Sequence, residues 1–196
     1  WAGDEQLQAE AVIAATGSRP VVPEIPGIDL PGVFMPRTLH EMRKLPEKMA
    51  IIGGSVAAAE FAYIFRSFGC DVTILSRSTF LKESDKHIRA LAVKELAGVR
   101  IRENTPVTLI EGKDRVDSVL TPDGTFEADA VFLAAGLVPN SGSLEGLKRG
   151  SLGEILVDTR MRTSISDVYA CGDVVGPPYL TPVARHQGVV AADNIL

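Results

Sequence analysis

The chain has 196 residues, a formal net charge of −5 at pH 7, 45% hydrophobic residues and 23% charged residues. This size and composition fit one globular domain with a sizeable core, or one domain with parts of a second. The acidic balance argues against a nucleic-acid partner. No run approaches the roughly 18 uninterrupted apolar residues of a membrane span, so no membrane partner is expected.

The start of the chain and its cysteines indicate where the protein works. The chain begins at Trp1 without a basic and apolar leader, which predicts no signal peptide and indicates an excised piece of a longer protein. Cys70 and Cys171 have no metal-ligand spacing, so a reduced, cytoplasmic protein is expected, with a disulfide between them as the less favoured alternative. The three histidines lie far apart, and no metal site is predicted.

Apolar runs and glycines predict an alternating α/β chain. A short strand at 9–15 precedes a proline-rich connector from Pro20 to Pro46, which suits extended backbone because proline lacks the N–H for regular hydrogen bonds. A repeated alternation then follows, with strands at 49–52, 71–75 and 99–102 and helices at 56–68 and 85–97. This order predicts parallel strands joined by helical crossovers, a Rossmann-like doubly wound sheet.

The second half of the chain has a different strand pattern. Short segments separated by turn residues predict an antiparallel β-meander at 105–110, 115–120 and 125–128. A buried strand at 130–134 and two more strands at 154–157 and 167–171 complete the expectation. The predicted fold class is therefore α/β, a doubly wound parallel sheet with an antiparallel meander.

The turn after the strand at 49–52 has the context of a dinucleotide-binding loop. Against the pattern G-x-G-x-x-G/A, the chain offers Gly53, Ser55 and Ala58. A turn with small side chains lets backbone N–H groups approach a pyrophosphate, and the helix N-terminus adds partial positive charge. Ser55 is expected to admit phosphate and donate a hydroxyl hydrogen bond. The alternative is a tight βαβ turn without a ligand.

The end of the strand at 71–75 bears on which dinucleotide binds. NAD sites usually place an acidic residue there for the ribose hydroxyls, whereas this chain has Ser76 and Arg77, with Lys82 shortly after. A guanidinium matches the oxygens of a 2′-phosphate, so NADP is favoured over NAD. The alternative is that Arg77 and Lys82 are solvated surface charges.

Four segments, in this order, resemble one family. They are ATGSRP at 15–20, IIGGSVAAAEFA at 51–62, AAG at 134–136 with Pro139 and Asn140, and MRTSISDVYACGDV at 161–174. Together they are similar to the pyridine nucleotide-disulfide oxidoreductases, among them dihydrolipoamide dehydrogenases, mercuric reductases and glutathione reductases. The resemblance implies an FAD-dependent NAD(P)H oxidoreductase, with residues 1–45 ending a flavin-domain segment, 46–160 binding NAD(P), and 161–196 returning to the flavin domain.

The resemblance also implies site residues. Those implied to contact the NAD(P) cofactor are Gly53, Gly54, Ser55, Val56, Ala57, Glu60, Ser76, Arg77, Lys82, Ala135 and Gly136. Those implied to contact FAD in the full-length protein are Thr16, Gly17, Gly172, Asp173 and Thr181, with Asp173 on the ribityl chain. Val56 stands where many members have a tyrosine lid over the flavin.

The family's redox and acid–base residues are not part of this chain. Its cysteine pair lies earlier in the flavin domain, and its His–Glu pair comes from a C-terminal dimerisation domain, so no catalytic residue is expected here. The missing flavin and dimerisation domains of a homodimeric parent are the implied partners. A ferredoxin or rubredoxin reductase, or an NADH oxidase, remains an alternative parent. A dinucleotide-binding module without redox activity is the alternative of another class.

Overall fold

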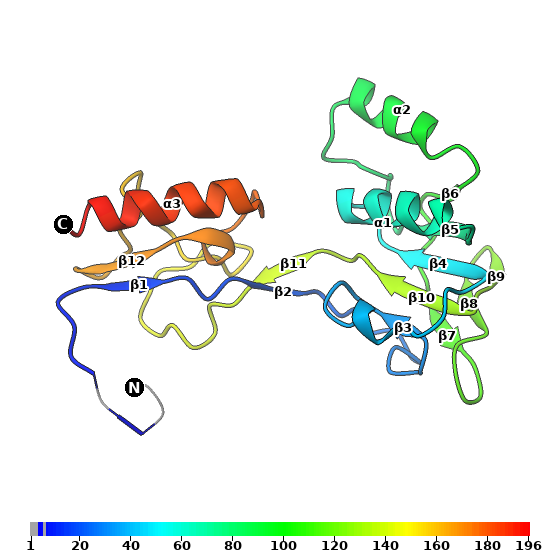
Figure 1. Ribbon diagram of the computed structural model, residues 1–196, viewed down its shortest axis with the longest axis horizontal. Coiled ribbons are helices and arrows are strands. Elements are labelled where there is room, and N and C mark those ends of the chain that lie inside the picture. Colours follow the sequence, from blue (N-terminus) through cyan, green and yellow to red (C-terminus); the bar gives the residue numbers. More distant parts are fainter. Residues whose placement is uncertain (1–3, 6) are drawn as a thin grey trace. The chain divides into compact units, whose positions relative to one another are not determined.

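The computed structural model describes residues 4, 5 and 7–196, so Trp1, on which the expectation of an excised piece rests, lies outside the described residues (Figure 1). The chain forms two compact units. The central unit is Pro20–Gly136, and the terminal unit comprises the described residues up to Arg19 together with Leu137–Leu196. These units divide the chain at other positions than the expected boundaries at 45 and 160, and the assignment of either unit to a ligand stays a prediction.

The central unit contains a five-stranded parallel sheet in the order β3-β10-β4-β5-β6. Its strands are β3 (Val33–Phe34), β4 (Lys48–Ile52), β5 (Asp71–Leu75), β6 (Arg100–Arg102) and β10 (Ala130–Leu133). The crossovers from β4 to β5 and from β5 to β6 run through α1 (Val56–Ser67) and α2 (Lys86–Glu95), as in a doubly wound fold. The predicted alternation of strands and helices is confirmed.

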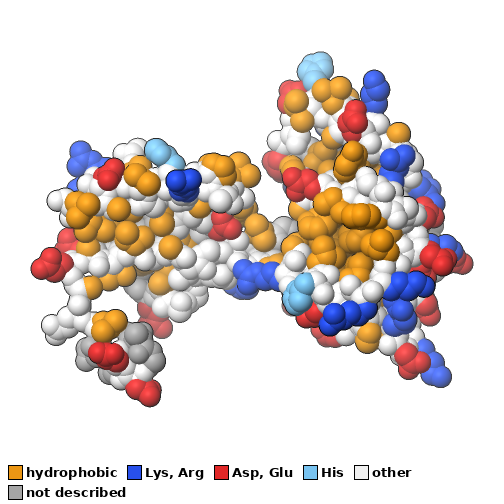
Figure 2. All heavy atoms as spheres, viewed as in Figure 1, with side chains coloured by type: hydrophobic (Ala, Val, Ile, Leu, Met, Phe, Trp, Pro, Cys, Tyr) orange, Lys and Arg blue, Asp and Glu red, His pale blue; other side chains and the backbone are white. Residues whose placement is uncertain are grey.

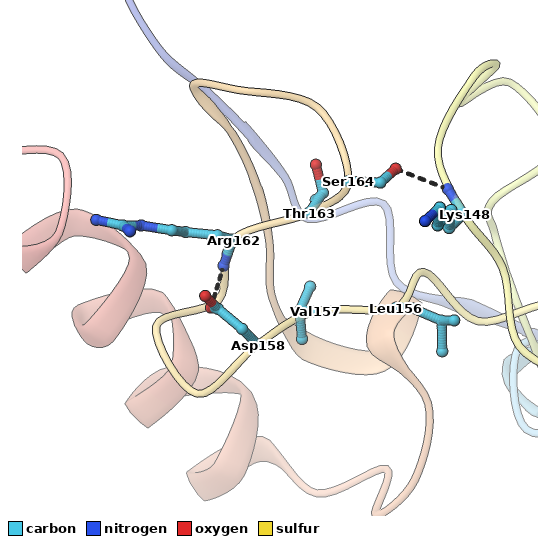
Figure 3. A pocket seen from close by; sticks show the side chains of 7 residues that line it. All are labelled: Lys148, Leu156, Val157, Asp158, Arg162, Thr163 and Ser164. Carbon is cyan, nitrogen blue, oxygen red and sulfur yellow. Dashed lines mark hydrogen bonds between the residues drawn. The ribbon is translucent and has the colours of Figure 1, made fainter.

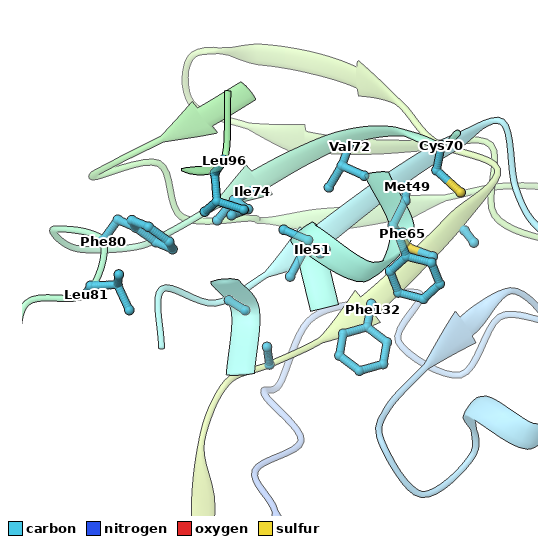
Figure 4. Packing of buried hydrophobic residues seen from close by; sticks show 14 residues of the cluster. Met49, Ile51, Phe65, Cys70, Val72, Ile74, Phe80, Leu81, Leu96 and Phe132 are labelled. Atoms are coloured by element: carbon cyan, nitrogen blue, oxygen red, sulfur yellow. The ribbon is translucent and has the colours of Figure 1, made fainter. Parts of the chain in front are cut away.

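Alternate side chains of the sheet enter two different cores, because successive residues of a strand point to opposite faces. On one face Met49 and Ile51 of β4 pack with Phe65 of α1 and Phe132 of β10 (Figure 4). On the other face Ala50 and Ile52 pack with residues of a three-stranded antiparallel sheet. That sheet is the predicted meander, with strands β7 (Leu109–Glu111), β8 (Ser118–Thr121) and β9 (Gly124–Glu127). A meander thus covers the face that helices cover in many doubly wound folds.

The proline-rich segment contributes more than an extended connector. Val33 and Phe34 add β3 to the edge of the parallel sheet beside β10, and η1 (Leu39–Glu41) follows. Apolar side chains from this segment pack onto both cores: Ile25, Ile28, Leu30 and Met35 on one, Phe34, Leu39 and Met42 on the other. The expectation of extended backbone holds for β3, whereas η1 departs from it. The prolines correctly indicated loops in this segment, but they did not indicate which of the apolar residues between them pack onto the two cores.

The terminal unit has a smaller core. β1 (Val12–Ala14) pairs in parallel with β12 (Val168–Ala170), and β2 (Ser18–Pro20) pairs with β11 (Leu137–Pro139). The turn η2 (Gly172–Val175) and the helix α3 (Thr181–Asp193) follow β12. The buried side chains Ala14, Ile155, Ala170 and Val174 form the core.

In the terminal unit one expected strand does not form, and one strand pair and one helix were not predicted. Residues 154–157 form no strand of their own; only Ile155 makes an isolated bridge, with Arg149. The pair β2–β11 was not predicted, because its partners are short and far apart in the chain. Helix α3 was not predicted either, although Pro182 in its first turn is a helix-start signal.

Among the residues that the structure describes, no helix combines the length and apolarity needed to cross a membrane.

Candidate functional site

The strand order of the central unit creates a switch point between β4 and β10. From β4 the chain moves through α1 to β5 on one side, whereas β10 lies on the other side of β4. Ligands of open α/β sheets bind outside the carboxyl ends of the strands at such a point. The loops that follow these two strands, Gly53–Ser55 and Ala134–Gly136, therefore meet at the expected binding edge, and both had been singled out from the sequence.

Two glycines of the first loop are required by close packing. Gly53 has φ +140°, and a Cβ on it would lie 2.2 Å from the carbonyl oxygen of Ala134. A Cβ on Gly54 would lie 2.2 Å from Oγ of Ser76, at the end of β5. The glycines thus hold the loop against both neighbouring strands. Packing alone accounts for them, so the ligand argument must rest on other groups.

Ser55 joins the two loops and caps α1. Its Oγ accepts a hydrogen bond from the backbone N–H of Ala58 at 3.4 Å and donates one to the carbonyl oxygen of Ala134 at 3.1 Å. A hydroxyl has a single proton to donate. In this arrangement the Ser55 proton is directed at Ala134, so the hydroxyl would have to rotate to donate to a phosphate, and that role of Ser55 stays a prediction.

The first turn of α1 provides backbone donors at the switch point. The first four N–H groups of a helix have no intrahelical partner. Those of Ala58 and Ala59 are bonded to Ser55, through Oγ at 3.4 Å and the carbonyl at 3.2 Å. The N–H groups of Val56 and Ala57 remain for an anion, which the helix dipole also favours. Val56 is exposed, and Glu60, one turn further, is exposed on the same helix.

The residues after β5 separate into a buried one and exposed ones. Ser76 is 1% exposed and lies under Gly54. Arg77 is exposed and makes no ion pair within the described part of the chain. Lys82 is also exposed, with Nζ 3.4 Å from Oε1 of Glu83. Both basic residues adjoin residues that contact Gly54, namely Ser76 and Leu81, and of the two only Lys82 has an ion pair among the described residues.

The second group of predicted residues comes together in the terminal unit. Since β1 and β12 are parallel, the segments after them, Thr16–Gly17 and Gly172–Asp173, leave the same edge. Thr16 Oγ1 donates to the carbonyl of Asn140 at 2.7 Å, and the N–H of Asn140 donates to the carbonyl of Gly17 at 2.9 Å. Gly17 has φ +70°, a conformation that favours glycine.

Asp173 is held from two sides. Its Oδ2 accepts a hydrogen bond from Oγ of Ser18 at 2.6 Å. The preceding Gly172, with φ +76°, donates its N–H to Oε1 of Gln187 on α3 at 2.8 Å. Thr181 is exposed at the first residue of the same helix.

The electrostatic surroundings of this group are negative. Burial raises the pKa of the Tyr179 hydroxyl above its ordinary value, and the charges of Glu154 and Asp173 raise it further. Burial also raises the pKa of Cys171, which precedes Gly172. The described residues contain no cluster of His, Cys, Asp and Glu that could hold a metal ion.

Sequence reasoning did not assign a site role to Ser18, Gln187 or Ala134. Ser18 and Ala134 lie within segments that had been singled out from the sequence, so the predicted site residues next to them could have pointed to them. Gln187 had no such signal, because it reaches Gly172 only through the unpredicted helix α3.

The pocket drawn in Figure 3 lies elsewhere in the terminal unit. It encloses about 290 Å³ and is lined by Lys148, Leu156, Val157, Asp158, Arg162, Thr163 and Ser164. A second pocket of about 500 Å³ in the central unit lies between α2 and the end of β6, lined by residues that include Arg89 and Glu103. Neither contains a residue predicted to bind a cofactor. The site is therefore defined by the strand ends and their donors.

Comparison with known proteins agrees with this geometry. The sequence model of the pyridine nucleotide-disulphide oxidoreductase family matches residues 2–188. A dihydrolipoyl dehydrogenase of Chlamydia pneumoniae is 34% identical over 96% of this chain and 42% of its own length. The flavoprotein disulfide reductase RclA of Escherichia coli, solved as a Cu(II) complex, superposes with a TM-score of 0.89 at 32% identity, over 97% of this chain and 46% of that chain.

A third similar protein is an engineered water-forming NADPH oxidase bound to NADPH. It is a multiple variant of a water-forming NADH oxidase from Lactobacillus brevis. It superposes with a TM-score of 0.83 at 27% identity, over 95% of this chain and 46% of that chain. This chain thus spans less than half the length of each of these three proteins.

Proposed function

Because the chain belongs to the pyridine nucleotide-disulphide oxidoreductase family, we propose that its central unit binds NADPH and that its terminal unit holds part of an FAD site. When bound together, the nicotinamide supplies a hydride and the flavin accepts it. This chain binds and orients the two cofactors and contributes no acid, base or nucleophile to the reaction.

Backbone donors and small residues support dinucleotide binding by the central unit. The N–H groups of Val56 and Ala57 face the switch point and suit the pyrophosphate. Ala135 and Gly136, in the loop after β10, are small residues beside these donors. Glu60, one turn into α1, is assigned to the nicotinamide end of the cofactor.

Arg77 is the observation that carries the preference for NADPH. It follows β5 directly, and the acidic residue of NAD sites is replaced by Ser76 at the strand end. Its exposed guanidinium suits a 2′-phosphate with parallel hydrogen bonds. Lys82 adds positive charge nearby, although Glu83 pairs with it.

The engineered NADPH oxidase supports the same preference. Three consecutive positions in that protein were changed from Asp to Ala, Ala to Arg and Met to Ser, eighteen positions after a change from Gly to Ala. This chain has Ser76, Arg77 and Ser78, eighteen positions after Ala58. By this spacing Ala58, Arg77 and Ser78 match residues of the NADPH-using variant, whereas Ser76 stands where the variant has Ala. A fifth change, Pro to Arg, falls by the same count on Glu83, next to Lys82.

Asp173 carries the flavin assignment in the terminal unit. A carboxylate accepts hydrogen bonds from the hydroxyls of a polyol such as the ribityl chain. Thr16 and Gly17 follow β1, Gly172 begins η2, and Thr181 begins α3. These five residues form the part of the FAD site that we assign to this chain.

The whole protein is proposed to be a cytoplasmic homodimer that passes electrons from NADPH through FAD to a disulfide or another acceptor. The acceptor chemistry lies outside this chain, so a ferredoxin or rubredoxin reductase or an NADH oxidase fits the same two sites. A dinucleotide-binding module without redox activity is the second candidate, since a fold alone does not fix function. Bound flavin that loses its visible absorbance when NADPH reduces it would exclude that candidate.

Calorimetric titration of the chain with NADPH and NADH tests the nucleotide assignment. NADPH is expected to bind more tightly, and Arg77→Ala is expected to weaken NADPH binding about tenfold, the effect of losing a charge-assisted hydrogen bond. Binding of NADH is expected to stay unchanged. Lys113→Ala, an exposed charge in the meander, is the matched control. Equal loss of NADPH affinity in both variants, or no loss in Arg77→Ala, contradicts the assignment.

A further inference from the structure

The side chain of Asp173 is oriented before any ligand arrives, and Ser18 is the residue that orients it. Resting on the flavin site proposed above, we propose that Ser18 is a positioning residue. It fixes the Asp173 carboxylate so that its free lone pairs face the hydroxyls of the flavin's polyol chain.

The contact between the two residues is short and sheltered. Ser18 Oγ lies 2.6 Å from Oδ2 of Asp173, and Ser18 is 9% exposed at the first residue of β2. Hydrogen bonds from a hydroxyl to a carboxylate are typically 2.5–2.7 Å long and roughly twice as strong as neutral ones. The pair joins β2 to η2 across most of the length of the chain, so local sequence does not determine it.

The backbone that carries Asp173 is fixed as well. Gly172 donates its N–H to Gln187 at 2.8 Å, and the N–H of Cys171 bonds to the carbonyl of Ala14 at 3.1 Å. With the backbone held at these two points, rotation of its own side chain is the main freedom left to Asp173. The Ser18 hydrogen bond restrains that rotation.

The Ser18 hydrogen bond improves ligand binding although Ser18 itself does not contact the ligand. A carboxylate has about four acceptor positions, and Ser18 takes one of them on Oδ2. The others remain for ligand hydroxyls. Because the side chain is ordered in advance, its entropy is not lost when the ligand binds. A residue that never touches the ligand therefore raises its affinity.

The test measures FAD affinity in the protein at the full length that its gene encodes. The apoprotein is titrated with FAD by quenching of flavin fluorescence. Ser18→Ala is expected to weaken binding about 10- to 100-fold, the range for a hydrogen bond to a charged group. Ser18→Cys, nearly the same shape with a weak donor, should fall between wild type and Ser18→Ala, and it decides the question if Ser18→Ala does not fold. Ser18→Thr keeps the hydroxyl and should restore wild-type affinity.

A double-mutant cycle separates positioning from general stability. Asp173→Ala should weaken FAD binding, and adding Ser18→Ala to it should cause no further loss, because no carboxylate remains to be positioned. The proposal is overturned if Ser18→Ala and Ser18→Cys bind FAD like wild type, or if Ser18→Ala weakens the Asp173→Ala protein by its full factor. A wild-type protein without FAD affinity, or an Asp173→Ala variant with wild-type affinity, would instead refute the flavin site itself.

Discussion

At the scale of single residues, Ser76 has a structural role as well as a place in the cofactor argument. Its side chain is buried under Gly54, close enough to exclude a Cβ there. The position after β5 is therefore part of the packing of the glycine loop. A substitution at this position therefore also changes the packing of the glycine loop.

We predict that Ser76→Asp destabilises the protein and does not produce a preference for NADH. The longer side chain must displace Gly54, and its carboxylate would be buried in a site built for a hydroxyl. The expected loss is about 3 kcal/mol of unfolding free energy, from overpacking and an unpaired polar group. Urea unfolding measures it, with Ser78→Asp, at a less buried position of the same loop, as the control. Equal stability of the two variants contradicts the role assigned to Ser76.

The sequence predicted which residues lie close together when each of them directly follows a strand. The carboxyl ends of parallel strands share an edge, so a strand prediction alone brings Gly53 and Ala135 together, or Thr16 and Asp173. It could not show where a hydroxyl proton points. The Ser55 proton goes to Ala134, 79 positions away, and only the fold makes that pair adjacent.

At the scale of elements, the glycine loop and α1 are joined through one side chain. Ser55 both caps the helix and bonds to the loop after β10. We predict that Ser55→Ala lowers the free energy of unfolding by about 1 kcal/mol, the usual cost of losing a serine cap. Ser67→Ala is the control, because Ser67 is exposed at the other end of α1 and donates to the carbonyl of Tyr63.

That control is expected to change stability by less than about 0.5 kcal/mol. Ser55→Thr keeps both hydrogen bonds and should retain wild-type stability. Thermal and urea unfolding of the three variants provide the measurement. If Ser55→Ala proves as stable as Ser67→Ala, Ser55 does not link the helix to the sheet.

A second element-scale prediction concerns pH and the turn that borders the pocket in Figure 3. Asp158 Oδ1 accepts hydrogen bonds from the backbone N–H groups of Arg160 at 2.8 Å and Arg162 at 2.9 Å. The N–H of Arg162 is the main cause of a pKa of Asp158 below its ordinary value, and the positive charges of both arginines act in the same direction. Met161 in this turn has φ +61°, so the turn needs such support.

The sign follows from the direction of that shift. A carboxyl with a lower pKa in the folded state stabilises the fold above its unfolded pKa, about 3.9, and the effect is lost as the pH falls through the folded pKa. Asp158→Ala should therefore be less stable than wild type at pH 7, and the difference should diminish as the pH falls through the lowered pKa of Asp158 in the folded state. Urea titrations at several pH values measure it, with exposed Asp114→Ala as control. A difference that persists at the acid end contradicts this account.

The elements that the sequence predicted best are those with the strongest local pattern. The buried runs of β4, β5 and β10 and the Ala-rich helix α1 were predicted to within two residues of their ends. Helix α3 was missed because its apolar residues follow the helical period less clearly than those of α1 and α2. The strands β2 and β11 are three residues each and depend on pairing between distant segments.

Some apolar surface belongs to no described core. Val56, Tyr63 and Ile64 of α1 and Phe68 directly after it are large exposed apolar side chains, and Figure 2 shows apolar side chains at the surface over this helix. Surface of this kind is usual where a further part of a protein packs. It agrees with the fraction of its relatives that the chain spans.

At the scale of the whole molecule, the two compact units have separate cores. The central unit contains both faces of the five-stranded sheet, whereas Ala14, Ile155, Ala170 and Val174 form the core of the terminal unit. Each unit also has one buried cysteine. Cys70 is 6% exposed in the central unit, and Cys171 is 7% exposed in the terminal unit. The two thiols are therefore natural probes of the two units.

We predict that NADPH protects Cys70 from alkylation and leaves Cys171 unchanged. Burial raises the pKa of both thiols, and the thiolate is the reactive form, so alkylation requires opening of the unit that contains the thiol. A ligand at 100 times its Kd stabilises its binding unit by about 2.7 kcal/mol. Pulsed iodoacetamide labelling across a urea series, read by mass spectrometry, should move the Cys70 midpoint to higher urea. Arg77→Ala should reduce that movement, because the variant binds NADPH less tightly. Equal movement of both midpoints would show instead that the ligand stabilises the two units as one.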